Sequence, residues 1–462
     1  MSTPSKPMPT DRFQPPRGTR DFYPIEMARR LWLEDKWRRT AVRHGFDEID
    51  GPTFEHLDLY TVKSGEGIVS ELFSFTRAGG ETPFALRPEF TPTLARMVAE
   101  KANALPKPIK WFSIGPYFRA ERPQRGRLRE FLQWNVDVLG DPSPEADAEV
   151  ITCCVEALKA LGLREQDISL RLGHRSSVTG VLTFFSVSES QHQQALLLLD
   201  KYFDGKIDDV ALGDGLRPLG ATDAIIPFMS QMKQRSTDHN FFYPLDDPDR
   251  EFAESLSAVY GPLVRALEAA GSRNWCHVDM RVVRGLAYYT GTVFEVHETT
   301  GAERAIAGGG RYDNLVELFG GPPTPAVGFA MGDVVISLVL QDKGLMPSDD
   351  QIARDLGLAP DAFVIAANDE AERHVLRPVL AALRREGLHA RRSYRATRNI
   401  GKLLQEADKA GARYAVILES PDRAQVKNLH SKEQVEVVAP APAPHDPQGL
   451  VEGIVRHILP PR

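Results

Sequence analysis

The chain of 462 residues contains only three cysteines, and this scarcity excludes a fold held together by disulfides. Cys153 and Cys154 are sequence neighbours whose side chains point away from one another, and Cys276 stands alone. Unpaired thiols are typical of a reducing compartment. We therefore expect the protein to be cytoplasmic.

Long apolar runs are missing as well. Nowhere do about 18 consecutive apolar residues occur, which is the length that a membrane-spanning helix requires. Residues 1–20 are polar and proline-rich, and they lack the apolar segment of a secretion signal. We expect neither membrane insertion nor secretion.

The chain also lacks an excess of basic residues, since its net charge is -7. The surface as a whole therefore does not indicate a nucleic-acid partner. Two short basic clusters nevertheless stand out, at residues 122–129 and 391–398. Charge alone leaves two interpretations open: a pair of solvated faces, or two contacts with one long ligand.

The length and an ordinary charged fraction of 26% predict two or three globular domains. Strand and helix patterns mix over residues 1–345, and residues 175–265 are rich enough in helix formers to be an inserted subdomain. Residues 346–360 have the composition of a linker. Residues 361–462 alternate strand and helix patterns, which predicts a small, mostly parallel α/β domain.

A hairpin with a basic tip is predicted near the middle of the first domain. Residues 109–121 and 130–140 have strand patterns, and residues 122–129 between them have turn and loop chemistry. A helix is expected over residues 144–161. Residues 46–56 predict a short strand that stops near Pro52.

Two arginines are embedded in strand-like sequence, Arg119 and Arg284. A charged side chain is costly to bury there unless it binds an anion. For Arg119 the alternative is an internal salt bridge with Glu121 or Asp137. Two guanidinium groups from separate strands suit a pentavalent phosphate transition state, because each can donate bidentate hydrogen bonds to phosphate oxygens.

Seven motifs occur in the order found in one enzyme family. They are RGTRDFYP at 17–24, GFDEIDGPTFE at 45–55, FALRPEFTPTLARM at 84–97, FRAERPQRGRLREF at 118–131, VRGLAYYTG at 283–291, AGGGRYD at 307–313 and TPAVGFAMG at 324–332. One such match would be weak, but the ordered set resembles the class II aminoacyl-tRNA synthetases of the histidine type over nearly the whole chain. EADKAGARYAVIL and VKNLHSKEQ near the end resemble that family's anticodon-binding domain.

The resemblance implies a fold and a reaction. The fold would be an α+β catalytic domain with a mainly antiparallel sheet, followed by a C-terminal α/β domain like those that bind anticodons. The reaction would be ATP-dependent ligation of L-histidine to its tRNA through histidyl-adenylate, with AMP and diphosphate released. Mg²⁺ would neutralise phosphate charge without a dedicated protein cage. GFDEIDGPTFE resembles the family's dimer-forming motif, with Pro52 in the place of its proline, and so implies a homodimer.

The resemblance also assigns roles around ATP. The carboxylate of histidine attacks the α-phosphate, so no protein nucleophile is needed. Arg119 and Arg284 would be the catalytic residues that hold the α-phosphate from two sides. Glu121 would face the adenine, and Arg127 would reach the outer phosphates.

Histidine itself would be held by a further set of residues. A pocket that hydrogen-bonds both ring nitrogens rejects analogues that lack them. The resemblance implies that Asp137 and Tyr289 bind the ring, and that Tyr288 and Tyr312 line the same pocket; the alternative for the tyrosines is ordinary packing in a core. The α-ammonium group would be received by Glu89, Thr91 and Gln133.

Contacts with tRNA(His) would come from both basic clusters. The resemblance implies that Arg122 and Gln124 in the hairpin meet the acceptor end. Charge and a stacking face suit an RNA loop, and Tyr394 supplies the stacking face. The anticodon arm would be held by Arg391, Arg392, Arg395 and Arg398.

Two positions depart from the family pattern. TPAVGFAMG resembles the start of the third class motif. Val335 stands where that motif has an arginine that grips the γ-phosphate, and no arginine lies within the next several residues. Losing one such donor would cost about 2–4 kcal/mol of transition-state stabilisation unless another group substitutes. Ala287 stands where the family commonly has aspartate.

Two other interpretations stay open. One is a synthetase-like regulatory subunit of ATP phosphoribosyltransferase in histidine biosynthesis, which keeps the fold without charging tRNA. Such relatives typically lack the anticodon domain and much of the second class motif, which FRAERPQRGRLREF resembles here. This chain has both. The other is an RNA-binding or stress-sensing module, which gives no reason for the motif arginines, carboxylates and tyrosines to coexist.

Overall fold

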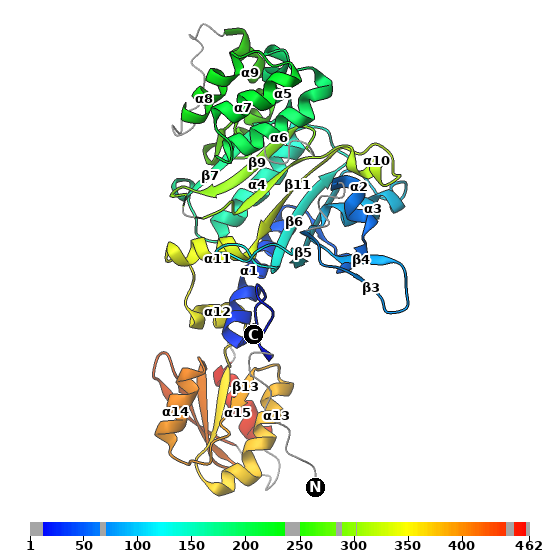
Figure 1. The fold of residues 1–462 in the computed structure, drawn as a ribbon. Coiled ribbons are helices and arrows are strands. Elements are labelled where there is room, and N and C mark those ends of the chain that lie inside the picture. Colours follow the sequence, from blue (N-terminus) through cyan, green and yellow to red (C-terminus); the bar gives the residue numbers. More distant parts are fainter. Residues whose placement is uncertain are drawn as a thin grey trace. The chain divides into compact units, whose positions relative to one another are not determined.

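A computed structural model describes residues 13–64, 71–235, 250–282, 289–301, 303–439 and 448–458 (Figure 1). The chain divides into two compact units. One comprises Leu33–Met346 and the residues up to Asp21, and the other comprises Phe22–Trp32 with Pro347–Arg462. Across these described ranges, no helix is both long and apolar enough to cross a membrane.

An eight-stranded sheet is the centre of the first unit. Its order is β1-β5-β6-β11-β10-β9-β7-β8. The pairs β1–β5 and β7–β8 are parallel and the other five are antiparallel, so the expected mainly antiparallel sheet is confirmed. The strands are β1 Asp47–Glu48, β5 Ile109–Phe118, β6 Glu130–Leu139, β7 Ile168–His174, β8 Cys276–Val278, β9 Thr292–Glu298, β10 Ala307–Arg311 and β11 Ala326–Gly332.

The two faces of this sheet are chemically different because side chains alternate along each strand. On β6, Trp134 points to one face, where it stacks on Trp37 at 5.8 Å and meets Phe329 edge-on at 5.0 Å. Its neighbours Gln133 and Asn135 point to the opposite face, which is therefore polar. The helices of this part are α3 Thr91–Lys101, α4 Pro144–Ala160, α10 Leu315–Leu318 and α11 Asp333–Asp342, with the residues of α1 Pro24–Arg43 from Leu33 onward.

Helix α4 matches the helix expected at 144–161. The Ser143 side chain accepts a hydrogen bond from the Ala146 amide and caps the first turn, and α4 packs against β6 and β11. Arg311 and Asp147 form a buried ion pair at 2.6 Å that ties β10 to this helix.

A second, three-stranded sheet follows Pro52. The expected short strand at 46–56 is divided in the structure, because β1 ends at Glu48 and a separate strand begins at Phe54. The strand order is β2-β4-β3. The elements are β2 Phe54–His56, α2 Asp58–Ser64, β3 Ser74–Thr76 and β4 Pro83–Leu86.

Helices cluster beyond β7 and β9, as Figure 1 shows. Leu199, Leu212 and Leu216 are fully buried among them, in a cluster that also takes in Val282 and Val293 from the sheet region. The helical character expected for the insertion is confirmed. The helices are α5 Arg175–Phe184, α6 His192–Phe203, α7 Asp209–Leu216, α8 Ile225–Arg235 and α9 Arg250–Ala269.

The second unit has a five-stranded sheet in the order β13-β12-β14-β15-β16. The first three strands are parallel, as expected, but β15 and β16 form an antiparallel hairpin with β14, so the expectation of a mostly parallel sheet is only half correct. The strands are β12 Ala362–Ala366, β13 Ala390–Arg392, β14 Tyr414–Ser420, β15 Arg423–Asn428 and β16 Gln434–Val438.

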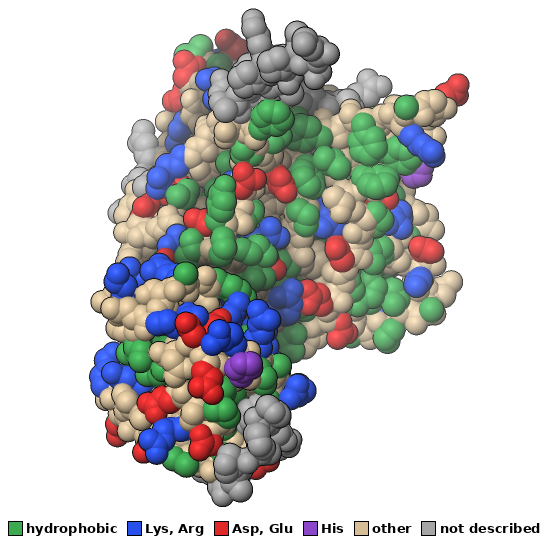
Figure 2. All heavy atoms as spheres, turned by 90° about the horizontal axis from the view of Figure 1, so that it is seen from below, with side chains coloured by type: hydrophobic (Ala, Val, Ile, Leu, Met, Phe, Trp, Pro, Cys, Tyr) green, Lys and Arg blue, Asp and Glu red, His purple; other side chains and the backbone are tan. Residues whose placement is uncertain are grey.

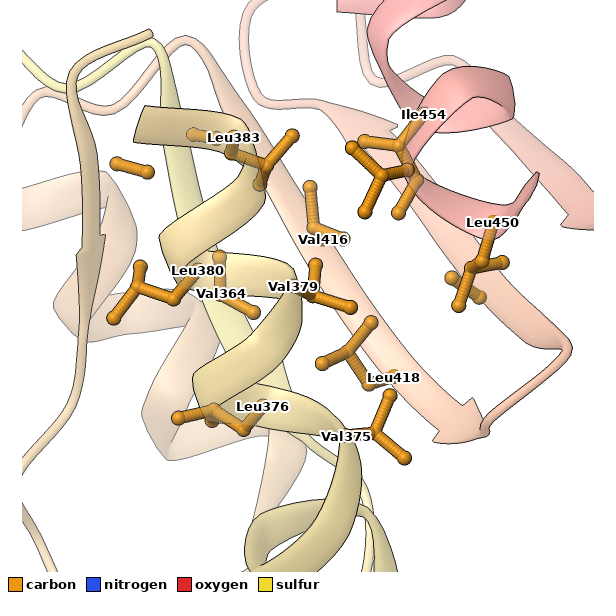
Figure 3. Packing of buried hydrophobic residues seen from close by; sticks show 14 of the residues in the cluster. Val364, Val375, Leu376, Val379, Leu380, Leu383, Val416, Leu418, Leu450 and Ile454 are labelled. Atoms are coloured by element: carbon orange, nitrogen blue, oxygen red, sulfur yellow. The ribbon is translucent and has the colours of Figure 1, made fainter. Parts of the chain in front are cut away.

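Helices on one side of this sheet form its larger core (Figure 3). Val379 and Leu383 from α13 pack with Leu450 and Ile454 from α15 over Val416. Their burial supplies the main stabilisation of this unit. The helices are α12 Asp349–Asp355, α13 Leu376–Arg385, α14 Ile400–Lys409 and α15 Gln448–Ile458.

Charges of both signs are interspersed on the face shown in Figure 2. Acidic side chains lie among the lysines and arginines there.

Candidate active site

A cavity of about 440 Å³ opens on the polar face of the large sheet. It draws together residues from β5–β6, the start of α3, β9, β10 and β11, which are far apart in sequence. Seven residues that the sequence analysis assigned to substrates are among its lining residues. The lining comprises Glu89, Thr91, Arg119, Gln133, Asn135, Asp137, Tyr289, Val293, Phe294, Glu295, Gly308, Gly309, Tyr312, Gly328, Phe329 and Ala330.

The floor of the cavity carries a chain of hydrogen bonds along β6. Gln133 Nε2 donates to Asn135 Oδ1 at 2.7 Å, and Asn135 Nδ2 donates to the hydroxyl of Tyr117 at 3.1 Å. The amide groups are therefore held in fixed orientations. Asn135 is not singled out in the sequence, although its place two residues from both Gln133 and Asp137 puts it on the same strand face.

Asp137 is buried in the wall of the cavity. The Tyr312 hydroxyl donates to its Oδ1 at 2.5 Å. Burial raises the pKa of Asp137 from its ordinary value to about 7, against the opposing effect of the Tyr312 hydrogen bond. Gly328 is required opposite it, because a Cβ there would lie 1.8 Å from Asp137 Oδ1. The carboxyl group therefore titrates near neutral pH.

Tyr289 lies between two apolar clusters. Its ring packs against the core of the helical insertion and against the core around α3, while the residue also lines the cavity. Burial raises the pKa of its hydroxyl above the ordinary range, so the group is a neutral donor at physiological pH. Tyr289 thus packs against the apolar cores and also lines the cavity.

Arg119 enters the cavity from the end of β5. Its Nε donates to the Pro88 carbonyl at 3.3 Å, and its guanidinium lies 5.3 Å from the centre of the Phe131 ring. The alternative of an internal salt bridge is not seen, since neither Glu121 nor Asp137, both described, forms an ion pair with it. The group is half-buried and positioned by a carbonyl and a ring.

The loop that joins β5 to β6 carries the other residues assigned to ATP. Arg127 forms an ion pair with Glu121, and Arg129 Nε donates to the Glu121 carbonyl at 3.1 Å. Glu121 and Arg127 do not belong to the lining of the cavity given above. Arg122 and Gln124 are exposed at the tip.

Comparison with known proteins gives the family. The family model described as histidyl-tRNA synthetase matches residues 18–333, which include the sheet and the cavity. The chain belongs to the histidyl-tRNA synthetase family. The resemblance drawn from its motifs is confirmed.

Sequence similarity to other members of the histidyl-tRNA synthetase family extends over nearly the whole chain. The histidine–tRNA ligase of Opitutus terrae is 42% identical over 413 residues, which cover 88% of this chain and 90% of that protein. The histidine–tRNA ligase of Halobacterium salinarum is 39% identical and covers 93% and 97%. The crystal structure of histidyl-tRNA synthetase from Nostoc sp. PCC 7120 superposes with a TM-score of 0.72 at 25% identity, covering 96% of this chain and 99% of that one.

One stretch that matters to a histidyl-tRNA synthetase lies outside the described residues. Arg284, Ala287 and Tyr288 belong to it, so the convergence of Arg284 with Arg119 on one phosphate stays a prediction. Val335, by contrast, is described and buried, with an exposure of 8%.

The cavity contains residues that the motifs do not indicate. Glu295 on β9 is hydrogen-bonded to His297 Nε2 at 2.9 Å and contributes a third carboxyl group beside Glu89 and Asp137. Apolar side chains on the cavity face come from Val293 and Ala330. Strand alternation could have placed Glu295 and Val293 on one face, but only strand pairing brings β9 next to the substrate residues.

The second basic cluster lies on and after β13. Arg392 pairs with Glu372 at 2.9 Å, and its guanidinium lies 4.4 Å from the ring centre of Tyr394, which is 83% exposed. Arg395 and Arg391 are exposed; Arg395 pairs with Glu406 at 3.3 Å, and Arg391 Nε donates to His389 Nε2 at 3.0 Å. Arg398 pairs with Asp369 at 2.9 Å. The cluster therefore combines exposed cations with one exposed aromatic ring.

Proposed function

We propose that this enzyme activates L-histidine with ATP and transfers it to tRNA(His). Histidyl-adenylate and diphosphate form in the first step, and AMP leaves in the second. The observation that supports this best is a single cavity that combines Arg119, suited to a phosphate, with Asp137 and Tyr289, suited to an imidazole.

The first step needs positioning rather than a protein nucleophile. The histidine carboxylate attacks the α-phosphorus, and the bond from that phosphorus to the bridging oxygen of diphosphate breaks. Arg119 donates to the α-phosphate oxygens as negative charge builds on them, and we assign Arg284 to the other side of the same group. Glu121 and Arg127 on the adjoining loop are assigned to the adenine and the outer phosphates.

Selection of histidine is assigned to Asp137 and Tyr289. The carboxylate of Asp137 accepts from one ring N–H, and the neutral Tyr289 hydroxyl donates to the other ring nitrogen. Side chains that lack either nitrogen leave a buried group without a partner, which costs orders of magnitude in binding. Tyr312 orients Asp137, and Tyr288 is assigned to the same pocket. Glu89, Thr91 and Gln133 are assigned to the α-ammonium group.

Mg²⁺ fits the donors that remain. Once Asp137 is assigned to the ring and Glu89 to the ammonium group, Glu295 is the carboxylate left in the cavity lining, and carboxylate oxygens are ligands that Mg²⁺ prefers. Most of the coordination would come from ATP phosphates and water. The ion would neutralise charge on the outer phosphates.

Transfer to tRNA(His) is assigned to surfaces on both units. Arg122 and Gln124, exposed at the loop tip, are available to the acceptor end. We assign catalysis to residues 1–345 with the insertion at 175–265, and anticodon binding to residues 361–462. The segment expected to be a linker, at 346–360, contains helix α12. In residues 361–462, Arg391, Arg392, Arg395 and Arg398 surround a ring on which a base could stack.

A homodimer is supported by an apolar patch on the small sheet. Phe54, Phe75 and Phe84 contact one another there, and Phe54 and Phe75 are 50% and 43% exposed. Exposed aromatic clusters are typical of protein interfaces. A reducing cytoplasm is supported by the three cysteines, which are all free and buried.

Histidine-dependent exchange of labelled diphosphate into ATP tests this function directly. We expect exchange by the purified dimer with histidine and none with other amino acids, followed by charging of tRNA(His). A folded dimer without exchange would instead favour the non-charging regulatory subunit of ATP phosphoribosyltransferase.

Removal of the exposed charges at the second basic cluster should affect only the tRNA step. We expect the double variant Arg391→Ala, Arg395→Ala to raise the KM for tRNA about tenfold, because each lost phosphate contact weakens binding. The slope of log KM against log salt should fall by about 1 to 2. Arg423→Ala, an exposed arginine on β15 of the same domain, is the control. Loss of diphosphate exchange in the double variant would contradict the assignment.

A further inference from the structure

Arg125 fastens the tip of the β5–β6 loop to two other segments. Its Nε donates to Glu303 Oε1 at 2.5 Å, in the connection between β9 and β10, and its Nη2 donates to Asp342 Oδ2 at 2.8 Å, at the end of α11. One planar guanidinium thus joins three segments that are distant in sequence.

The two arms of this contact differ in burial. The Glu303 side chain is only 4% exposed, whereas Asp342 is 54% exposed and Arg125 is 61% exposed. An exposed ion pair contributes little by itself. A buried carboxylate, however, needs a partner, so Glu303 gives the contact a fixed anchor.

Gly126 brings the loop flat against the same two segments. Its φ of +74° is in the left-handed region, and a Cβ added there would lie 3.4 Å from Val335 Cγ2 and 3.5 Å from Glu303 Oε2. The loop tip therefore packs directly on the apolar side chain at position 335. A longer side chain at that position would meet the loop tip.

The position of the loop tip also determines the position of the Arg127 backbone. The Gln124 amide donates to the Arg127 carbonyl at 3.0 Å, and the Arg127 amide donates back to the Gln124 carbonyl at 2.9 Å. Residues 124–127 thus form a closed turn with Arg125 inside it. Where Arg125 is fixed, the backbone of Arg127 is fixed too.

We propose that Arg125 is a positioning residue that, through Glu303 and Asp342, holds Glu121 and Arg127 in place for ATP. This proposal rests on the proposed function, because it concerns the nucleotide side of that reaction. Val335 contributes to this arrangement, because its apolar side chain is the surface on which the loop tip packs. Outer-phosphate contacts then come from the loop that Arg125 holds, and not from a side chain on α11.

We call the contacts of Arg125 with Glu303 and Asp342 the clamp, and the kinetics of diphosphate exchange test it. Arg125→Ala should raise the KM for ATP about tenfold, the effect of losing a hydrogen bond to a buried carboxylate, and leave the KM for histidine unchanged. Arg125→Lys should recover part of the loss, since an ammonium group can reach only one carboxylate. Asp342→Asn, which keeps the Glu303 arm, should have a smaller effect than Glu303→Gln.

The insertion offers a matched control. Arg217 also bridges two carboxylates, Asp214 and Asp223, both at 2.8 Å, and is 56% exposed. Arg217→Ala should leave both KM values unchanged. If Arg125→Ala leaves the KM for ATP unchanged, or raises both KM values equally, Arg125 does not position the nucleotide residues.

Val335→Arg gives a second and opposite test. The clamp predicts a higher KM for ATP, because the new side chain displaces the loop tip; a lower KM would overturn the proposal. Failure of the proposed function is distinguishable, because it appears as no exchange by the unmodified chain. In that case the affinity of the Arg125 variants for ATP, measured by calorimetry, still decides on the clamp.

Discussion

Replacing Arg119 by alanine should lower the kcat of histidine-dependent diphosphate exchange by about 10²–10³-fold, the usual effect of removing one fixed donor from a developing charge. The KM for histidine should change little, because the described residues assigned to histidine lie on β6, at or just before the start of α3, just before β9 and just after β10. The guanidinium is held by the Pro88 carbonyl and by the Phe131 ring, so its orientation is set before ATP binds. Arg119→Lys should recover only a small part of the rate, since an ammonium group cannot make the bidentate contact.

Stability measurements separate this effect from misfolding. Arg119 is half-buried and forms no ion pair with the carboxylates nearest to it in sequence, so its removal leaves no buried charge behind. The thermal midpoint of Arg119→Ala should therefore match that of the unmodified chain and of Arg217→Ala. A loss of less than fivefold in kcat with an unchanged midpoint would remove Arg119 from the catalytic role.

The strands that carry the site could be predicted from local pattern, but their neighbours could not. The alternation of residues 130–140 predicts β6 correctly, and it places Gln133 and Asp137 on one face. The pairing of β6 with β11 puts Gly328 against Asp137, and the pairing of β9 with β10 puts Glu295 beside Gly308. The first of these pairings joins strands more than 100 residues apart, and no periodicity within one segment encodes it.

The contacts of Arg125 show the same limit. Its partners lie 178 and 217 residues away, so the sequence shows a basic loop and not a clamped one. Val335 is apparent from the sequence as a departure from the family. Its position under Gly126 becomes visible only when the loop and α11 are packed together.

The second unit shows how local pattern misleads. Alternating strands and helices up to Ser420 indicate a parallel sheet, and β12, β13 and β14 follow that rule. Residues 423–438 then add two strands without a helix between them. Strands joined by so short a connection can pair only in the antiparallel sense, because a parallel crossover needs a dozen or more residues.

Replacing Asp137 by asparagine should weaken the binding of histidine about 10²-fold, while the KM for ATP changes little. Asparagine keeps the shape and can still accept from Tyr312, but it loses the charge that strengthens the hydrogen bond to the imidazole N–H. Equal losses for histidine and ATP would count against a ring-binding role.

The same substitution should stabilise the protein above pH 7. Because burial raises the pKa of Asp137 to about 7, the carboxyl is neutral in both folded and unfolded chains below about pH 4 and costs nothing there. Between pH 4 and 7 the unfolded chain ionises first, so the folded state loses stability, and the full penalty is present above pH 7. Asparagine removes a penalty on the order of 2–4 kcal/mol, which a higher denaturation midpoint at pH 8, but not at pH 4, would reveal.

The KM for histidine should also depend on pH, because Asp137 ionises near neutral pH. If the ionised carboxylate accepts the ring N–H, the KM for histidine falls about tenfold between pH 6 and pH 8, as the ionised fraction of Asp137 rises from roughly a tenth to nine tenths. Free histidine titrates in the same range, but it does so equally for the Asp137→Asn variant, and the ratio of the two KM values isolates the protein group. Tyr312→Phe should move this profile to higher pH, since the Tyr312 hydrogen bond lowers the pKa of Asp137. A ratio that stays constant with pH would mean that Asp137 does not change its charge when histidine binds.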